Sequence, residues 1–376
     1  MSDLQKLRTE LQDKFVERDE VIDGTLTAIL ARQHVLMIGP PGTAKSMLAS
    51  ELCNRFPGTN FFEWLLTKFS TPEEIFGPVS LQALERDEYL RITTDKLPEA
   101  HVAFLDEIFK ANSSILNALL SLINERKFHN GGKPQDAPLI SLIGASNELP
   151  DEEELGALYD RFLVRFLVDY IEDDANFVTM LSGTNGKKAT QIPLKDLQGM
   201  QAEVESLRVP ELIVDLIVQI RNKLRKENVI ASDRRYHDAI SLLRARAYLE
   251  GRSEVIDSDL VILANVLWNT PEEIRIVENI VYDLANPFER RAEEFLKQAE
   301  EIMAYAQRDW TDADERTKAG IEAHTKFKKI QSRIADVVRR VQQEGRSLGR
   351  IDEVRLQVEA MHNNILENCL GLEDAR

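Results

Sequence analysis

The stretch Val35-Leu36-Met37-Ile38-Gly39-Pro40-Pro41-Gly42-Thr43-Ala44-Lys45-Ser46 decides the fold. Its four apolar residues are typical of a buried strand, and a helical pattern marked by Met47, Leu48 and Leu52 follows the loop. A strand, a glycine-containing loop and a helix in this order place backbone N–H groups where they bind phosphate. The segment therefore predicts a phosphate-binding loop in an α/β fold with a parallel sheet.

Each residue of this loop has an expected task. The backbone cradle is formed by Gly39, Pro40, Pro41, Gly42, Thr43 and Ala44. Lys45 is expected to reach the β- and γ-phosphates of ATP or ADP, and the Ser46 hydroxyl to bind Mg²⁺. Such loops usually have glycine before the lysine, where this chain has Ala44. Because alanine is small and Gly42 keeps the loop flexible, we expect nucleotide binding to survive the change.

A second motif, Val102-Ala103-Phe104-Leu105-Asp106-Glu107, ends an apolar run with two acids. A buried strand delivers them at its carboxyl end, where α/β sheets bind ligands. We expect Asp106 to hold Mg²⁺, directly or through water, and Glu107 to act as the base that polarises the attacking water. Taken alone, the motif is more typical of a strand that runs into an acidic helix cap. The phosphate-binding loop about 60 residues earlier favours the catalytic interpretation.

Further polar residues follow. Asn147 ends the run Ile143-Gly144-Ala145-Ser146 and can bond both the attacking water and the γ-phosphate, although a strand-end asparagine is usually a turn residue. Arg161 and Arg165 are each candidates for the cation that a neighbouring subunit adds during phosphoryl transfer. Either arginine could instead pair locally with Asp160 or Asp169.

Arg234 and Arg235 follow a helix start at Ser232-Asp233. One of them is expected to contact the γ-phosphate from the side of the lid, the helical domain that follows the core.

The pattern along the chain predicts three domains. Residues 1–185 alternate apolar runs with helical patterns, as in a parallel sheet covered by helices on both faces. Residues 186–285 carry helical periodicity alone, with one helix opened by Pro210 and another capped by Asp257-Ser258-Asp259, and predict an all-α lid. A turn-rich stretch, Ser182 to Lys188, separates the two.

Residues 286–376 show apolar positions spaced by four and three residues, which predicts three helices packed along heptad seams. Breaks are expected at Thr311-Asp312, Gly345 and Gly349. Either a stabilising role or a docking role fits such a bundle.

Composition narrows the class of protein. Net charge is −17, and residues 286–376 hold 18 acids against 16 Lys/Arg, so almost all of the excess acid lies in residues 1–285. Such an acidic body argues against nucleic acid as the main substrate. The chain shows no pattern of a signal peptide or a membrane span, and Cys53 and Cys369 are its two cysteines. We therefore expect a cytoplasmic protein.

Taken together, these motifs resemble the MoxR family of AAA+ ATPases, most closely its regulatory-ATPase-variant (RavA) branch. The likeness covers about residues 15–285 and is most specific in 66–78, 123–128, 145–150, 158–161 and 232–235. It implies that Asn147 is sensor 1, Arg161 the arginine finger acting in trans, and Arg234 sensor 2 with Arg235 in reserve. The RavA branch carries a β-rich module in its C-terminal region, whereas the pattern here predicts only heptad helices.

The resemblance also implies a homo-hexameric ring and two insertions on its pore side, a helix-2 insert in residues 67–100 and a hairpin at 128–133. Asn130-Gly131 is independently a strong hairpin signal. MoxR-type ATPases act with a partner that carries a von Willebrand factor A domain, and help to mature protein complexes. We therefore expect an Mg²⁺-dependent ATPase that remodels a protein. A nucleic-acid motor and a nucleotide-gated scaffold are the alternatives, which the acidic body and the Asp106-Glu107 pair disfavour, respectively.

Overall fold

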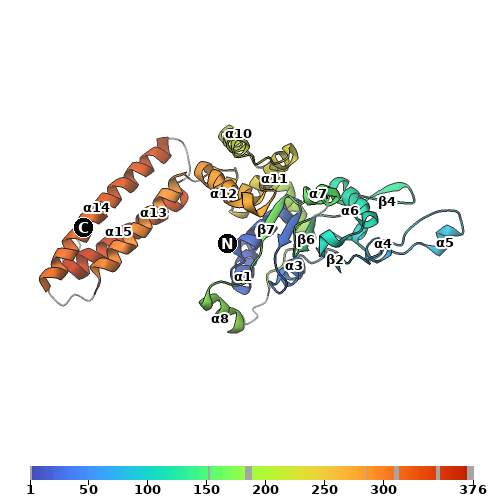
Figure 1. The fold of residues 1–376 in the computed structure, drawn as a ribbon, viewed down its shortest axis with the longest axis horizontal. Helices are drawn as coiled ribbons and strands as arrows, with labels where there is room; N and C mark the ends of the chain where they lie inside the picture. The colour runs from blue at the N-terminus through green and yellow to red at the C-terminus, as the bar shows by residue number, and fades with distance from the viewer. Residues whose placement is uncertain are drawn as a thin grey trace. The chain divides into compact units, whose positions relative to one another are not determined.

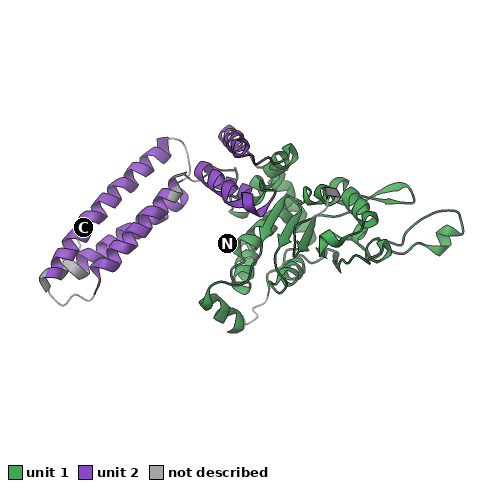
Figure 2. Ribbon diagram, in the orientation of Figure 1, with its two compact units in different colours: residues 1–209, 230–255, 265–269 green, residues 210–229, 256–264, 270–376 purple. Residues whose placement is uncertain are grey.

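The computed structural model describes residues 2–150, 153–182, 189–285, 287–308, 313–343 and 348–370. They form two compact units, drawn in different colours in Figure 2. The first comprises residues 1–209, 230–255 and 265–269, and the second comprises 210–229, 256–264 and 270–376. This division cuts across the predicted lid, because parts of residues 186–285 belong to each unit.

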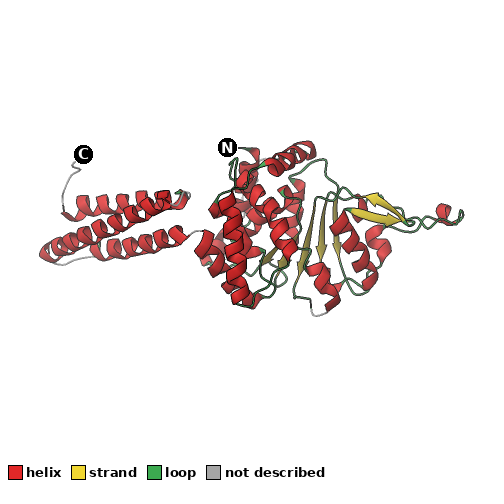
Figure 3. Cartoon of the chain, turned by 90° about the horizontal axis from the view of Figure 1, so that it is seen from above, coloured by secondary structure: helices red, strands yellow, loops and turns green. Residues whose placement is uncertain are grey.

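The first unit is built on a five-stranded sheet in the order β2-β3-β6-β1-β7, with neighbouring strands all parallel (Figure 1). Its strands are β1 (Val35–Ile38), β2 (Phe61–Leu65), β3 (Val102–Asp106), β6 (Ser141–Ser146) and β7 (Val164–Leu167). All residues of β1 and β6 are buried, as expected for central strands covered on both faces. Figure 3 shows helices on both sides of this sheet. The predicted fold class is confirmed.

The helices of the first unit precede, connect and follow these strands along the chain. They are α1 (Asp3–Lys14), α2 (Asp19–Leu30), α3 (Lys45–Asn54), α4 (Pro72–Phe76), α5 (Leu81–Leu84), α6 (Ser113–Glu125), α7 (Glu153–Tyr159), α8 (Asp174–Ser182), α9 (Leu194–Ser206) and α11 (Asp233–Leu249), with short 3₁₀ turns η1 (Leu97–Glu99) and η2 (Ile108–Lys110). Ser232 caps α11 by accepting from the backbone N–H of Arg235, as its sequence predicts.

Both predicted insertions are present in the first unit. The hairpin consists of antiparallel strands β4 (Lys127–Asn130) and β5 (Lys133–Asp136), joined through glycines at positive φ. The other insertion carries α4, and then α5 at the end of an arm closed by a bridge between Val79 and Arg91. The side-chain amide of Asn130 joins the two insertions: it accepts from the N–H of Arg91 (2.7 Å) and donates to its C=O (3.1 Å).

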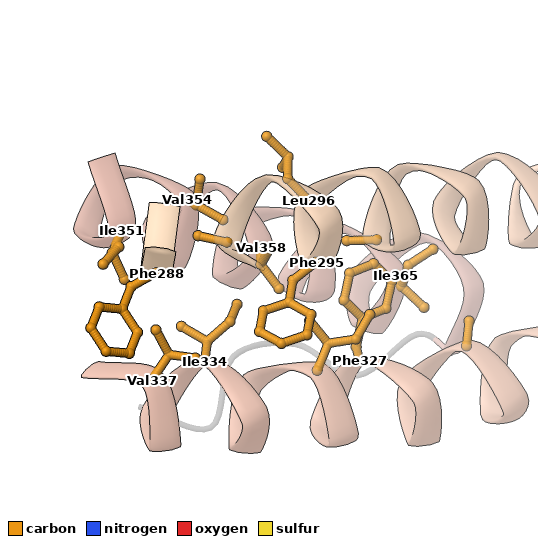
Figure 4. Close-up of a cluster of buried hydrophobic side chains, with 14 of the residues drawn as sticks. Phe288, Phe295, Leu296, Phe327, Ile334, Val337, Ile351, Val354, Val358 and Ile365 are labelled. Atoms are coloured by element: carbon orange, nitrogen blue, oxygen red, sulfur yellow. The ribbon is translucent and has the colours of Figure 1, made fainter. Parts of the chain in front are cut away.

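The second unit is helical. It contains α10 (Glu211–Lys226), α12 (Pro271–Ala285), α13 (Pro287–Ala306), α14 (Ala313–Gln343) and α15 (Gly349–Leu370), and most of the 3₁₀ run η3 (Asp257–Asn265). The three predicted heptad seams of α13, α14 and α15 meet in one apolar core (Figure 4). Phe327, Ile365 and Val358 in this core are fully excluded from solvent. The prediction of a three-helix bundle is therefore confirmed.

One local prediction in the lid was wrong. The stretch Asp257-Ser258-Asp259 opens the 3₁₀ run η3, and the α-helix begins only at Pro271. Asp259 nevertheless caps locally, since its carboxylate accepts from the N–H of Ile256 (2.9 Å). The expected breaks at 183–188, Thr311-Asp312 and Gly345, and the side chain of Cys369, lie outside the described residues. In the part of the chain that is described, no helix is long and apolar enough to cross a bilayer.

Candidate functional site

The phosphate-binding loop leaves the carboxyl end of β1 and is held between both neighbouring strands. The N–H of Gly39 donates to the carbonyl of Ser146 at the end of β6 (3.0 Å). On the other side, a Cβ at Gly39 would lie 1.9 Å from the carbonyl oxygen of Val168, just after β7. Glycine is therefore required at position 39 by the close approach of backbone.

Two loop residues adopt the left-handed conformation, Gly42 with φ +84° and Ala44 with φ +65°. Glycine adopts this conformation without cost, whereas a side chain is strained there. This explains physically why the consensus has glycine where this chain has Ala44. Alanine adopts the same backbone geometry, so the loop keeps its shape.

Lys45 begins α3 and is 8% exposed. Its ammonium turns back over the loop and donates to the carbonyls of Gly39 (2.6 Å) and Pro40 (2.8 Å). Burial lowers the pKa of Lys45, while the nearby carboxylates of Asp106 and Glu107 act in the opposite direction. The cation thus lies in the loop, within electrostatic reach of both acids.

The paired acids lie at the same edge of the sheet. Asp106 ends β3, and its carboxylate accepts from the N–H of Glu107 (2.9 Å), which has φ +52°. The side-chain amide of Asn147, which follows β6, donates to the Glu107 carboxylate at 2.5 Å. Lys110 pairs with the same carboxylate at 3.3 Å. The structure thus brings together Lys45, Asp106, Glu107 and Asn147, which the sequence places far apart.

The residues at this edge fit a magnesium ion beside a nucleotide. Ser46 presents its hydroxyl from the first turn of α3 and is exposed, and Asp106 is half-buried at the end of β3. Magnesium takes oxygen ligands and is usually held by one or two protein groups together with phosphates and water. A hydroxyl and a carboxylate next to a phosphate-binding loop form such a donor set.

The arginines lie at the opposite end of the sheet. Val35 of β1 pairs in parallel register with Val164 of β7, so Arg161 precedes the amino ends of these strands. A pocket of about 530 Å³ opens there, and both Arg161 and Arg234 line it. The sequence alone gave no indication that this pocket also contains Arg32 and Arg126, which follow α2 and α6.

Arg165 does not fit the predicted role of an arginine finger. It is fully buried, and its guanidinium donates to the carbonyls of Trp268 (2.6 Å), Phe162 (3.0 Å) and Tyr159 (3.1 Å). Burial and the neighbouring Arg235 lower its pKa to about 9. A finger must reach a second subunit, whereas this side chain is held inside its own.

Arg235 is likewise held inside its own subunit. It is 3% exposed and is bound by Asp160 (2.9 Å) and by the side chain of Asn269 (2.8 Å). Arg234 is exposed, and among the described residues its side chain has no hydrogen bond or ion pair. Of the two sensor 2 candidates, Arg234 has the freedom that contact with a nucleotide requires.

Comparison with known proteins adds independent findings. A protein-family model described as the MoxR domain in the MoxR-vWA-beta-propeller ternary systems matches residues 2–208, and an AAA lid domain model matches residues 212–281. An uncharacterized protein of Methanocaldococcus jannaschii, MJ0079, is 44% identical over 304 residues, 80% of this chain and 79% of that protein. The chaperone MoxR1 of Mycobacterium tuberculosis is 26% identical over 69% of this chain and 72% of its own length.

Among solved structures, a protein from Cytophaga hutchinsonii described as a candidate ATPase has the same fold, with a TM-score of 0.60 and 17% identity. The match covers 74% of this chain and 93% of that one. The strand order, the phosphate-binding loop and the paired acids define a P-loop protein of the AAA+ class. Because the MoxR-domain model matches residues 2–208, more than half of the chain, the chain belongs to the MoxR family of AAA+ ATPases.

Proposed function

We propose that this chain hydrolyses ATP as a hexameric ring and uses the reaction to remodel, activate or chaperone a protein partner. The observation that carries the proposal is the division of the site between the two ends of the sheet. Lys45, Asp106, Glu107 and Asn147 lie at the carboxyl end, and Arg161 and Arg234 lie beyond the amino end.

This division calls for a second copy of the chain. The four residues of β1 span about 13 Å, and the loop and Arg161 lie beyond opposite ends of that span. Since an arginine side chain is shorter than this distance, Arg161 cannot reach the phosphates bound by its own subunit. A ring places the arginine pocket of one subunit against the phosphate loop of the next, which completes each site.

Each residue then has a defined role in the proposed reaction. Lys45 exchanges its carbonyl partners for oxygens of the β- and γ-phosphates. Glu107, oriented by Asn147, accepts a proton from the attacking water. Ser46 and Asp106 would hold a magnesium ion, which would neutralise charge at the phosphates when bound. A neighbour's Arg161 and Arg234 add positive charge to the transferring phosphoryl group.

The comparisons support a protein partner. The matching family model belongs to MoxR-vWA-beta-propeller systems, which favours a partner with a von Willebrand factor A domain, and MoxR1 is described as a chaperone. We assign partner docking to residues 286–376, whose bundle has an apolar core of its own. The RavA-like branch and a cytoplasmic location remain predictions from the sequence.

Turnover and nucleotide binding, measured separately, test the proposed chemistry. Glu107→Gln should bind ATP normally but hydrolyse it ~10²–10⁴-fold more slowly, because it lacks the base. Lys45→Ala should lose nucleotide binding itself. Glu63→Gln, on the exposed face of neighbouring β2, is the matched control and should behave as wild type. Wild-type turnover in Glu107→Gln would remove that residue from the mechanism, and turnover stimulated by duplex DNA would favour a nucleic-acid motor.

A further inference from the structure

The arginine pocket, the pocket that Arg161 and Arg234 line, differs in charge from the part of the chain that contains it. Residues 1–285 are strongly acidic, yet this pocket is lined by five arginines, Arg32, Arg126, Arg161, Arg234 and Arg235, against three carboxylates, Glu125, Asp160 and Asp238. The formal balance within the pocket is therefore positive. Clustered cations repel one another unless an anion joins them.

Two of these arginines occupy backbone positions that normally favour glycine. Arg32 lies two residues after the end of α2 at φ +56°, and Arg126 directly follows α6 at φ +55°. Glycine is the common residue in the left-handed position after a helix, and a side chain there costs about 1 kcal/mol or more. Two arginines in such positions, both lining one pocket, indicate that the side chains are needed there.

The two side chains differ in their freedom. Arg126 donates to the carbonyls of Arg32 (2.5 Å) and Ile140 (3.3 Å), so it fixes the backbone from which Arg32 projects. Burial, followed by the charge of Arg32, lowers the pKa of Arg126 to about 10. Arg32 itself is exposed, and its guanidinium has no hydrogen bond or ion pair to any described residue.

Arg161 resembles Arg32 in this respect. Its Nε is buried without a hydrogen-bond partner in the described ranges. Its guanidinium also forms no ion pair with a carboxylate there. Arg32, Arg161 and Arg234 are thus three available cations in one pocket, while Arg126 and Arg235 are held by the protein.

We propose that Arg32 is a third phosphate-contacting residue, which reaches the triphosphate of the neighbouring subunit together with Arg161 and Arg234. The inference rests on the proposed ring, because the phosphate-binding loop lies at the opposite end of the sheet from Arg32. A polyphosphate carries enough charge to satisfy three guanidinium groups, which bind phosphate oxygens through paired N–H donors.

Arg32→Gly tests this role without straining the backbone. Glycine fits φ +56°, so the variant should keep the wild-type melting temperature and assembly size while its kcat falls at least about tenfold, less than the ~10³-fold typical of an arginine finger. Its affinity for a fluorescent ATP analogue in unassembled subunits should not change. Arg32→Lys should retain most of the rate because the charge remains.

A matched control exists in Asn228→Gly. Asn228 also lies at positive φ (+61°) after a helix, α10, but outside the pocket, and its replacement should leave kcat unchanged. A mixture of Arg32→Gly chains with Lys45→Ala chains should exceed the activity of either alone, since the second kind supplies an intact arginine pocket. That gain would also show that Arg32 contacts the nucleotide of a neighbouring subunit. If Arg32 bound free phosphate instead, mixing the two chains would give no gain.

Wild-type kcat in Arg32→Gly, loss of assembly in that variant, or an absence of complementation would each overturn the inference. Arg161→Ala, measured in parallel, distinguishes a failure of the proposed role of Arg32 from a failure of the proposed ring. If Arg161→Ala is inactive while Arg32→Gly is normal, only the role of Arg32 fails. If both turn over at the wild-type rate, the proposed sharing of sites between subunits fails as well.

Discussion

At the scale of single residues, the phosphate-binding loop has one glycine that is sterically required, Gly39, and an alanine, Ala44, where such loops usually have glycine. Gly39 has the carbonyl of Val168 where its Cβ would be, whereas Ala44 accepts a left-handed backbone with a small side chain. The two positions therefore should respond in opposite ways to exchange between glycine and alanine.

We predict that Gly39→Ala destabilises the chain by about 3 kcal/mol and abolishes ATP binding, because the backbone must move to relieve the clash. Ala44→Gly should change the free energy of unfolding by less than about 1 kcal/mol, since relief of strain and loss of chain entropy oppose each other. Denaturant unfolding and ATP titration measure both effects. Normal ATP binding by Gly39→Ala would show that the loop is not held as described.

Substitution of Arg165 should lower the stability of the chain, whereas substitution of Arg161 should lower its rate of ATP hydrolysis. Arg165→Met removes a buried donor from the carbonyls of Phe162, Trp268 and Tyr159, and should cost about 3 kcal/mol of unfolding free energy. Arg161→Ala should melt near the wild-type temperature and lose activity. A stable but inactive Arg165→Met would return Arg165 to the list of finger candidates.

Several site residues could be placed from the sequence because parallel strands all end at one edge of a sheet. That rule puts Asp106, Glu107 and Asn147 beside Lys45, as the structure does. The burial of Arg165 could not be predicted, since its carbonyl partner at Trp268 lies about 100 residues away. Every residue has a backbone carbonyl, so no residue type in the sequence marks such a partner. The left-handed arginines at 32 and 126 were missed for a similar reason, because no local pattern marks their conformation.

At the scale of elements, one side chain joins the two insertions of the first unit. Asn130 is 6% exposed and bonds both backbone groups of Arg91, while Gly131 beside it has φ +61°, which favours glycine. We predict that Asn130→Ala raises amide hydrogen exchange in residues 78–92 and 127–136, since two hydrogen bonds worth about 1–2 kcal/mol are lost.

The neighbouring Gln135 provides the control for that measurement. It lies exposed on β5 of the same hairpin, and Gln135→Ala should leave exchange in both segments unchanged. If Asn130→Ala exchanged like the wild type, the insertions would not be coupled through this side chain.

The bundle contains a pair of histidines that should make it sensitive to acid. His324 Nδ1 and His362 Nε2 lie 2.8 Å apart, and Phe327 stacks on the His362 ring. Burial, with the charges of His324 and Lys328, lowers the pKa of His362. A lowered pKa means that the unfolded state takes up the proton first, so the stabilisation is present above the ordinary histidine pKa of 6.5 and is lost as pH falls below it.

We therefore expect faster amide exchange in α14 and α15 at pH 5.5 than at pH 7.5, after correction for intrinsic rates. His362→Leu should remove most of this difference because it has no proton to take up. An equal pH effect in wild type and variant would place the sensitivity elsewhere.

Elements were easier to predict than their packing. Five apolar runs gave five strands, and heptad spacing gave three bundle helices, because both periods follow from which faces are buried. The lid was harder, since acids at Asp257 and Asp259 resemble an α-helix cap but open a 3₁₀ run. Its division between two compact units depends on long-range contacts, which periodicity does not contain.

At the scale of the whole molecule, the proposed function places half of a catalytic site at each end of the sheet. The phosphate loop and its acids are at one end, and the arginine pocket is at the other. A single subunit therefore should bind ATP but hydrolyse it poorly. Under the proposed function, turnover therefore requires assembly of subunits.

The most direct test mixes two inactive chains. Arg161→Ala keeps a working phosphate loop, and Lys45→Ala keeps an intact arginine pocket, so a mixed ring contains some complete sites. We predict that the mixture hydrolyses ATP well above the sum of the separate variants, with mixed rings verified by native mass spectrometry. Mixed rings that show no gain over the separate variants would contradict a site shared between subunits.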